Sequence, residues 1–183
     1  TGFSEPNAWV VLIAGETDQS ILFCEPKDRL METWTGKRWG PAAAAEHFGF
    51  DQAFATSDLD IQIPLLMTGL KVLFTNTGRS RTPKYLTLLH VWLEKAQTLL
   101  RGTRATPTQW IDIGEPLSEM RLIKDASELD TMRRAASISA LGHTRAMQTA
   151  QPGLHEYELE AELLYVFRKH GAQSVAYDSI VAA

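Results

Sequence analysis

A long amphipathic segment in the second half of the chain places the strongest limit on the fold. Apolar and small residues recur there at spacings of three or four: Leu129, Met132, Ala136, Ser139, His143 and Met147. This period predicts one helix from Ala126 to Thr149, about 36 Å long. Asp125, with Glu128 three residues later, can form a capping box at its start. One face of this helix therefore needs to be covered by other elements.

The segments that follow do not supply enough cover. Pro152-Gly153 breaks the helix, a second helix is expected over about 155–170, and 173–181 is predicted to open a sheet. Two helices and one strand cannot bury their apolar faces by themselves. We therefore expect a second domain that begins near Met120 and is unfinished, with both ends of the chain cut. The faces of Leu129 and Leu159 would then stay exposed and lower solubility.

Strand and helix patterns alternate before residue 117. The expected order is a hairpin of strands at 8–13 and 20–23, a loop or short strand at 27–40, helices at 41–48 and about 58–67, a strand at 71–75, a loop at 76–82 and a helix at about 83–100. Gly49 and Gly102 are expected to stop two of the helices, and Ser57 to cap another. The pattern predicts an α/β domain over 1–117 whose sheet is covered by helices, followed by a second domain over 118–183.

Charge, cysteine content and hydropathy exclude several classes of function. The net charge is −4 and no basic run appears, which argues against nucleic acid as a partner. No stretch approaches the ~20 apolar residues that span a membrane. The single cysteine, Cys24, cannot form an internal disulfide and is expected to be a small buried side chain. A chain without disulfides fits the cytoplasm.

No catalytic motif is visible in the residues alone. The sequence lacks a glycine-rich phosphate loop, paired cysteines, a zinc-protease motif and a serine-hydrolase motif. The carboxylates at positions 156, 158, 160 and 162 are interpreted as a solvated helix face. His143 and His170 are expected to be core histidines with satisfied hydrogen bonds. Composition and spacing therefore indicate no active site.

Several phrases, in order and spacing, do resemble a known family. They are TGFSEP from Thr1, ETWTGKRWG from Glu32, EMRLIK from Glu119, HTRAM from His143, Pro152-Gly153 with Glu156-Tyr157, and YDSIV from Tyr177. Together they resemble the Xaa-Pro aminopeptidases (aminopeptidase P) of the creatinase or pita-bread metallopeptidase family, over essentially the whole chain. The chain departs from the family at Lys37, which stands where the family has the first of two arginines and weakens a bidentate role there.

The resemblance implies a fold and an activity. It implies a creatinase-like α/β domain, followed by the first two helices and first strand of a pita-bread α+β domain. The activity is metal-dependent hydrolysis that releases the N-terminal residue from peptides with proline second, by a homo-oligomer with two Mn²⁺ ions per site. Two metals can generate a hydroxide nucleophile and polarise the carbonyl. The family's metal ligands and catalytic histidine lie beyond Val181, so none is assigned here and the chain alone is predicted to be inactive.

The resemblance also implies lesser parts of a substrate site. Tyr177 and Ile180 match positions that line the substrate pocket, although a buried sheet tyrosine and isoleucine would fit as well. Arg104 matches an arginine near the mouth of the site that can pair with a carboxylate, or it is plain surface. Trp34 matches a loop tryptophan that reaches into a neighbouring subunit's active site, or it packs locally.

Two other functions stay open at this stage. One is a related pita-bread enzyme, such as a prolidase or a creatinase, although the first seventy positions match the aminopeptidases better. The other is a non-catalytic module that binds peptides in a cleft without metal. A downstream segment without the two metal-binding aspartates would indicate the latter.

Overall fold

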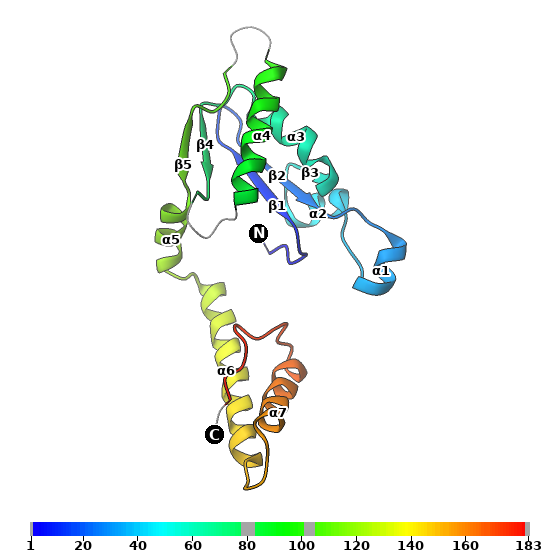
Figure 1. Cartoon of the computed structure of the whole chain (residues 1–183), viewed down its shortest axis with the longest axis vertical. Helices are drawn as coiled ribbons and strands as arrows, with labels where there is room; N and C mark the ends of the chain where they lie inside the picture. Colours follow the sequence, from blue (N-terminus) through cyan, green and yellow to red (C-terminus); the bar gives the residue numbers. More distant parts are fainter. Residues whose placement is uncertain (1, 78–82, 101–104, 182–183) are drawn as a thin grey trace. The chain divides into compact units, whose positions relative to one another are not determined.

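The chain divides into two compact units, Thr1–Glu115 and Pro116–Ala183. The computed structural model describes residues 2–77, 83–100 and 105–181. Figure 1 shows the elements of each unit along the chain. The domains expected from the sequence, 1–117 and 118–183, place the division at nearly the same point.

A three-stranded sheet lies at the centre of the first unit. Strand β1 (Trp9–Ile13) pairs antiparallel with β2 (Gln19–Cys24), and β2 pairs parallel with β3 (Gln52–Ala55). The predicted hairpin is therefore confirmed. Strand β3 was not predicted, because four residues between two helices carry too little alternation to identify a strand.

Strand β2 is buried on both of its faces. Its side chains from Ile21 to Cys24 are fully shielded from solvent. Ile21 and Phe23 pack with residues of helices α3 (Leu59–Met67) and α4 (Pro83–Leu99), whereas Leu22 and Cys24 pack against Ala44 of helix α2 (Pro41–Phe48). Helices thus cover both faces of the sheet, as expected for an α/β fold. Cys24 is the small buried side chain that the sequence predicted.

The helix boundaries agree closely with the sequence, except at one cap. Helix α2 begins at Pro41 and ends before Gly49, whose φ of 71° is left-handed. Helix α3 follows a 3₁₀ turn, η1 (Thr56–Asp58), so the predicted cap by Ser57 is wrong: its hydroxyl lies 3.3 Å from Asp58 Oδ1 instead. Helix α4 ends at Leu99. Gly102 and most of the expected 76–82 loop lie outside the described residues.

Two further elements were missed, a strand of the first unit and a helix at the boundary between the units. Strand β4 (Val72–Thr75) was predicted, but its parallel partner β5 (Gln109–Asp112) was not. Asp112 at the end of β5 accepts hydrogen bonds from the Gly114 backbone N–H (2.7 Å) and the Thr77 hydroxyl (2.9 Å). These bonds lower the pKa of the Asp112 carboxyl. Helix α5 (Gly114–Leu122) follows, and its apolar side chains Leu117 and Met120 are exposed.

The segment 27–40 contains a helix, not the loop or short strand that was predicted. Helix α1 spans Arg29–Thr35. Its sequence includes threonine and tryptophan, whose modest helix propensity made a helix hard to predict here. Asp28 is the N-cap, and its carboxylate accepts hydrogen bonds from the backbone N–H groups of Leu30 (2.8 Å) and Met31 (3.2 Å). An aspartate at this position satisfies donors that the helix itself leaves open.

The second unit is built on two helices packed side by side (Figure 1). Helix α6 spans Ala126–Thr149, as predicted, and α7 spans Glu156–Lys169. The predicted capping box of α6 is confirmed: the Glu128 N–H donates to Asp125 Oδ1 (2.8 Å) and the Asp125 N–H donates to Glu128 Oε2 (2.9 Å). The two residues thereby satisfy each other's backbone donors at the start of the helix.

The less exposed positions of helix α6 are mostly small residues rather than the large ones of the apolar stripe read from the sequence: Ser139, Gly142, Ala146 and Thr149, with Ile138. Gly142 is buried against the ring of Phe167, so closely that an added Cβ would lie 2.5 Å from Cε1. Met132 and Met147 of the predicted stripe are 54% and 72% exposed. His143 is exposed, so the prediction that it is a core histidine is wrong: α6 turns the neighbouring Gly142 toward Phe167 of α7.

Three other expectations for the second unit need correction: the solvated glutamate face, the strand at 173–181 and the core histidine His170. The glutamates of α7 are more than a solvated face: Glu162 pairs with Arg145 at 2.8 Å, and Glu158 Oε2 accepts a 2.7 Å hydrogen bond from the N-cap His155 N–H. The predicted strand at 173–181 has no strand conformation over its described residues. A strand needs a neighbour to satisfy its backbone, and none pairs with this segment in the described chain. His170 is exposed, and its Nδ1 lies 2.9 Å from the Val166 carbonyl oxygen of its own helix.

Candidate functional site

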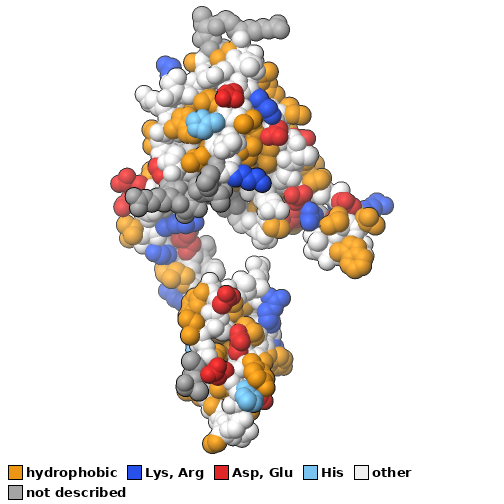
Figure 2. All heavy atoms as spheres, viewed as in Figure 1, with side chains coloured by type: hydrophobic (Ala, Val, Ile, Leu, Met, Phe, Trp, Pro, Cys, Tyr) orange, Lys and Arg blue, Asp and Glu red, His pale blue; other side chains and the backbone are white. Residues whose placement is uncertain are grey.

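Helix α1 carries the most exposed group of large apolar side chains in the first unit. Leu30, Met31 and Trp34 are 75%, 43% and 83% exposed. Their spacing places them along one side of the helix. Figure 1 shows α1 standing away from the sheet of its unit, and Figure 2 shows apolar side chains gathered over it. Exposed tryptophans with neighbouring apolar residues are typical of contact surfaces. We call these three residues the apolar tip.

Local hydrogen bonds explain why such a short, exposed helix forms. The Asp28 cap satisfies two backbone N–H groups at its start. At its end, the Thr35 hydroxyl donates to the Met31 carbonyl (2.9 Å), and the Gly36 N–H donates to the Glu32 carbonyl (3.0 Å). Gly36 has a φ of 86°, a conformation that favours glycine and ends the helix.

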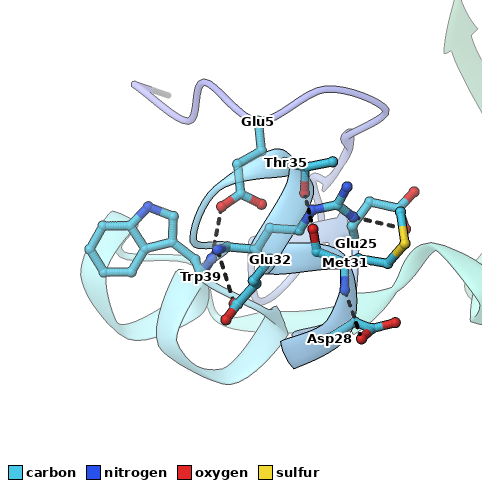
Figure 3. Close-up of polar contacts among 8 residues, drawn as sticks. Glu5, Glu25, Asp28, Met31, Glu32, Thr35 and Trp39 are labelled. Atoms are coloured by element: carbon cyan, nitrogen blue, oxygen red, sulfur yellow. Dashed lines mark hydrogen bonds and ion pairs between the residues drawn. The ribbon is translucent and has the colours of Figure 1, made fainter.

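A second set of contacts joins α1 to the backbone that returns to the sheet (Figure 3). Glu32 Oε1 accepts a 3.1 Å hydrogen bond from the Arg38 N–H, and Glu5 Oε1 accepts one of 2.7 Å from the Trp39 N–H. The Arg38 guanidinium lies 3.6 Å from Glu25 Oε2, in a pair that is partly shielded from water. The carboxylates of Glu5 and Glu32 therefore both accept hydrogen bonds from the backbone segment that follows α1.

Aromatic contacts of the Trp39 side chain also hold the segment that follows α1. The Trp39 ring stacks on His47 with centroids 4.3 Å apart and meets Phe48 edge-on at 5.5 Å. Gly40 follows with a φ of 70°, and a Cβ there would lie 3.2 Å from the Lys27 Cβ. The loop that carries the apolar tip thus starts and ends on a packed base.

Trp34 was predicted as a site residue from the sequence, but the residues that hold its loop were not. Glu5 and Glu32 belong to the phrases that carry the resemblance, yet their partners are backbone N–H groups of Trp39 and Arg38. Backbone donors leave no trace in a sequence. The available signal in the sequence was Glu32, a charged residue in a segment rich in glycine and tryptophan.

The other predicted site residues lie apart from this loop or outside the described chain. Tyr177 and Ile180 belong to the second unit and are 77% and 88% exposed, so the alternative reading as buried sheet residues is not what the structure has. Arg104 lies outside the described residues. Trp34 does not pack locally against the core, since its side chain is mostly exposed.

A shallow hollow of about 520 Å³ lies beside the segment that contains Tyr177 and Ile180. Its walls come from the start of α7 and the end of the described chain: Leu154, His155, Glu156, Tyr157, Glu160, Ser179 and Val181. The rings of His155 and Tyr157 stack there with centroids 5.3 Å apart. Tyr177 and Ile180 flank this hollow along the chain but do not line it.

The described residues do not form a metal site. Over 2–77, 83–100 and 105–181, no three His, Cys, Asp or Glu side chains lie together in a way that could hold a metal ion. Cys24 is no substitute as a reactive group, because its burial, with the nearby Glu5 and Glu25 carboxylates, raises the pKa of its thiol. Over the same residues, no helix has both the length and the apolar character to cross a membrane.

Comparison with known families finds a match for each part of the chain. Residues 1–74 match the family described as aminopeptidase P, N-terminal domain, and residues 130–183 match metallopeptidase family M24. The front part is thus similar to the aminopeptidase P N-terminal domain, and the later part is similar to metallopeptidase family M24. The family resemblance read from the sequence is confirmed.

Individual relatives agree over the whole chain. The chain is 37% identical to an Xaa-Pro aminopeptidase of Escherichia coli and 35% identical to one of Haemophilus influenzae, with 100% of this chain covered in each case. A solved structure of aminopeptidase P from E. coli superposes with a TM-score of 0.87 at 37% identity, over 98% of this chain and 41% of that one. The chain spans 42% and 40% of the lengths of the two curated relatives.

Proposed function

We propose that the protein to which this chain belongs is an Xaa-Pro aminopeptidase. It releases the N-terminal residue from peptides that have proline in the second position. The observation that carries the proposal is the similarity to E. coli aminopeptidase P across the entire chain, in both sequence and fold. A second candidate, a prolidase or creatinase, has no observation of its own in favour of it.

Metallopeptidase family M24 is named for its use of metal, and we propose two Mn²⁺ ions for the complete protein. Oxygen ligands with one imidazole suit this ion, and a metal pair supplies a hydroxide nucleophile and polarises the scissile carbonyl. The described residues do not hold the ions, and no step of the reaction is assigned to them. The role that we propose for the described residues is to contact the substrate around the metal site.

Trp34 is the residue that we assign most directly to substrate. Its indole is 83% exposed on a projecting helix. Such a side chain can cover an apolar substrate group such as proline, which offers a ring and no N–H. We propose that it does so in the cleft of a second copy of the protein, which makes the active enzyme a homo-oligomer. We place this oligomer in the cytoplasm.

Tyr177, Ile180 and Arg104 are proposed to contact substrate within the complete protein. The exposure of Tyr177 and Ile180 leaves both side chains available to a peptide. Arg104 is assigned to the terminal carboxylate of the peptide, because a guanidinium binds a carboxylate through two parallel hydrogen bonds.

The test is an activity assay on the full-length protein from its source gene. We expect Mn²⁺-dependent release of the first residue from a tripeptide with proline second, and no release from the matched tripeptide with alanine second. A chelator should abolish the release and added Mn²⁺ should restore it. Cleavage of dipeptides alone would instead indicate a prolidase, and tight peptide binding without cleavage would indicate a non-catalytic module.

A further inference from the structure

Helix α1 lacks the packing that usually fixes the orientation of a helix. None of its residues from Arg29 to Thr35 is buried. A helix this short, with every side chain at least partly exposed, is marginal on its own. The direction in which α1 presents Trp34 must therefore depend on contacts at its base.

Glu32 supplies the first of these contacts from within the helix. Its carboxylate reaches out of the helix to the Arg38 N–H (3.1 Å), while its own carbonyl accepts from the Gly36 N–H (3.0 Å). One residue thus closes the loop twice, through its side chain and its backbone. Without the side-chain bond, Gly36 would be a free pivot between α1 and Arg38.

Glu5 supplies the second contact from a distant part of the chain. It precedes strand β1, and its Oε1 accepts the Trp39 N–H at 2.7 Å. Its Oε2 is buried and has no hydrogen-bond partner among the described residues. A buried carboxylate oxygen without a partner lowers the stability of the fold. The single hydrogen bond from the Trp39 N–H therefore does not by itself explain a glutamate at position 5, and we infer a role beyond stability.

The two acceptors act on adjacent residues of an otherwise anchored segment. Arg38 pairs with Glu25, and the Trp39 ring is stacked on His47. Glu5 joins this segment to the residues that precede strand β1. Glu32 joins helix α1 to the same segment. Figure 3 shows both carboxylates directed at the returning backbone.

We propose that Glu5 and Glu32 are positioning residues that hold helix α1 so that Trp34 meets the substrate. This inference rests on the proposed substrate contact of Trp34. The carboxylates do not touch substrate; they act through the loop. Their loss should let α1 swing about Gly36 and should weaken substrate binding without altering the chemical step.

The experiment measures kcat and KM for a tripeptide with proline second, using the full-length protein. Glu32→Ala and Glu5→Ala should each raise KM about threefold to tenfold, the effect expected for loss of one ordinary, at least partly solvent-accessible hydrogen bond. The value of kcat should be unchanged. Glu32→Gln should restore KM, since its amide oxygen still accepts the Arg38 N–H. Glu46→Ala, which removes an exposed carboxylate from α2, is the matched control and should change neither constant.

Two further measurements separate positioning from general stability. Amide hydrogen exchange over residues 29–39 should accelerate in both alanine variants, while the melting temperature stays that of the parent protein. In a Trp34→Ala background, Glu32→Ala should raise KM no further, because the residue acts only through Trp34.

Each failure has its own signature. Unchanged exchange over 29–39 in Glu32→Ala, or an equal rise in KM with and without Trp34, overturns the positioning role. An unchanged KM in Trp34→Ala alone overturns the substrate contact of Trp34, and the positioning role with it. That result is obtained without touching either carboxylate, so the two failures are distinguishable.

Discussion

The two units bury their apolar residues in opposite ways. In the first, the central strand β2 has helices on both faces, and the side chains of Phe23 and Leu22 are fully shielded. In the second, α6 and α7 meet along a seam of small residues around Gly142, whereas Leu129 and Met132 are exposed. A layered sheet completes its own core within about a hundred residues, but a helical pair leaves one side of each helix uncovered.

This difference predicts where the chain is sensitive to change. Large buried side chains concentrate the stability of the first unit at a few positions. The second unit depends on close helix approach and on caps, because few of its large side chains are buried. The largest effects are therefore expected in the core of the first unit, and the smallest at solvated ion pairs of the second.

Phe23→Ala should destabilise the first unit most. Phe23 is fully buried and its ring centroid lies 5.6 Å from that of Phe54, so truncation leaves a cavity in the main core. We expect a loss of about 3–5 kcal/mol in the free energy of unfolding, measured by chemical denaturation. Leu12 on β1 is 75% exposed. Leu12→Ala should therefore stay within about 0.5 kcal/mol, and equal losses at the two positions would contradict the layered core.

Gly142→Ala should destabilise the second unit. The new methyl group would meet the ring of Phe167. Overpacking costs about 1–3 kcal/mol, which outweighs the gain of about 1 kcal/mol from alanine in a helix. Hydrogen exchange of the amides in 126–169 reports the change. In a Phe167→Ala background the same substitution should stabilise the helix instead. Destabilisation in both backgrounds would mean that the seam is not where the structure has it.

Acidification should weaken both units through aspartates with lowered pKa values, among them Asp51 in the first unit and Asp125 in the second. Hydrogen bonds from the Ser20 hydroxyl and backbone N–H (both 2.7 Å) lower the pKa of Asp51, and the Glu128 N–H lowers that of Asp125. Both folded-state pKa values lie below the ordinary 3.8. The stabilisation is therefore complete above that pH and is lost as the pH falls through the lowered values.

Asp51→Asn and Asp125→Asn isolate these two contributions. Unfolding followed from about pH 5 downward, an acid range set by ordinary carboxyl titration, should show a shallower loss of stability in each variant than in the parent chain. Exchange of the amides should assign the change to the first unit for Asp51 and to the start of α6 for Asp125. An identical pH dependence in parent and variants would show that neither carboxylate is held as described.

Glu162→Gln should have the smallest effect. Its carboxylate accepts a 2.8 Å hydrogen bond from Arg145 Nε, which raises the pKa of that guanidinium, but the pair is solvated. Solvated ion pairs contribute little and are screened by salt. Melting curves of parent and variant should differ slightly at low salt and coincide at high salt. A loss as large as that from Gly142→Ala would mean that the ion pair, and not the small-residue seam, joins the helices.

Particular elements show how far sequence reasoning could reach. Helices α2 and α6 were predicted with their observed ends. Proline, glycine and a capping box mark such termini through local contacts alone. Strands β3 and β5 were not predicted, because each is short and is defined by its hydrogen bonds to a neighbouring strand. The expected strand at 173–181 fails for the converse reason: its residues favour a strand, but the described chain offers no partner.

The candidate site divides in the same way. Trp34 was singled out by the phrase around it, whereas the helix that carries it and the two carboxylates that hold its loop were not. Those carboxylates bind backbone N–H groups brought near by folding, and a backbone group has no residue identity to read.

The amino-acid sequence by itself determined the family resemblance, the α/β class of the front part, and the start and end of the long helix. Each of these depends on local order: motif spacing, alternation of patterns, and caps a few residues apart. Only the tertiary structure decided that β2 is buried on both faces, that α6 turns its small residues toward α7, and that Glu5 reaches the Trp39 backbone. These contacts join positions far apart in the chain, and such pairs are selected by packing and hydrogen-bond geometry, which no local pattern encodes.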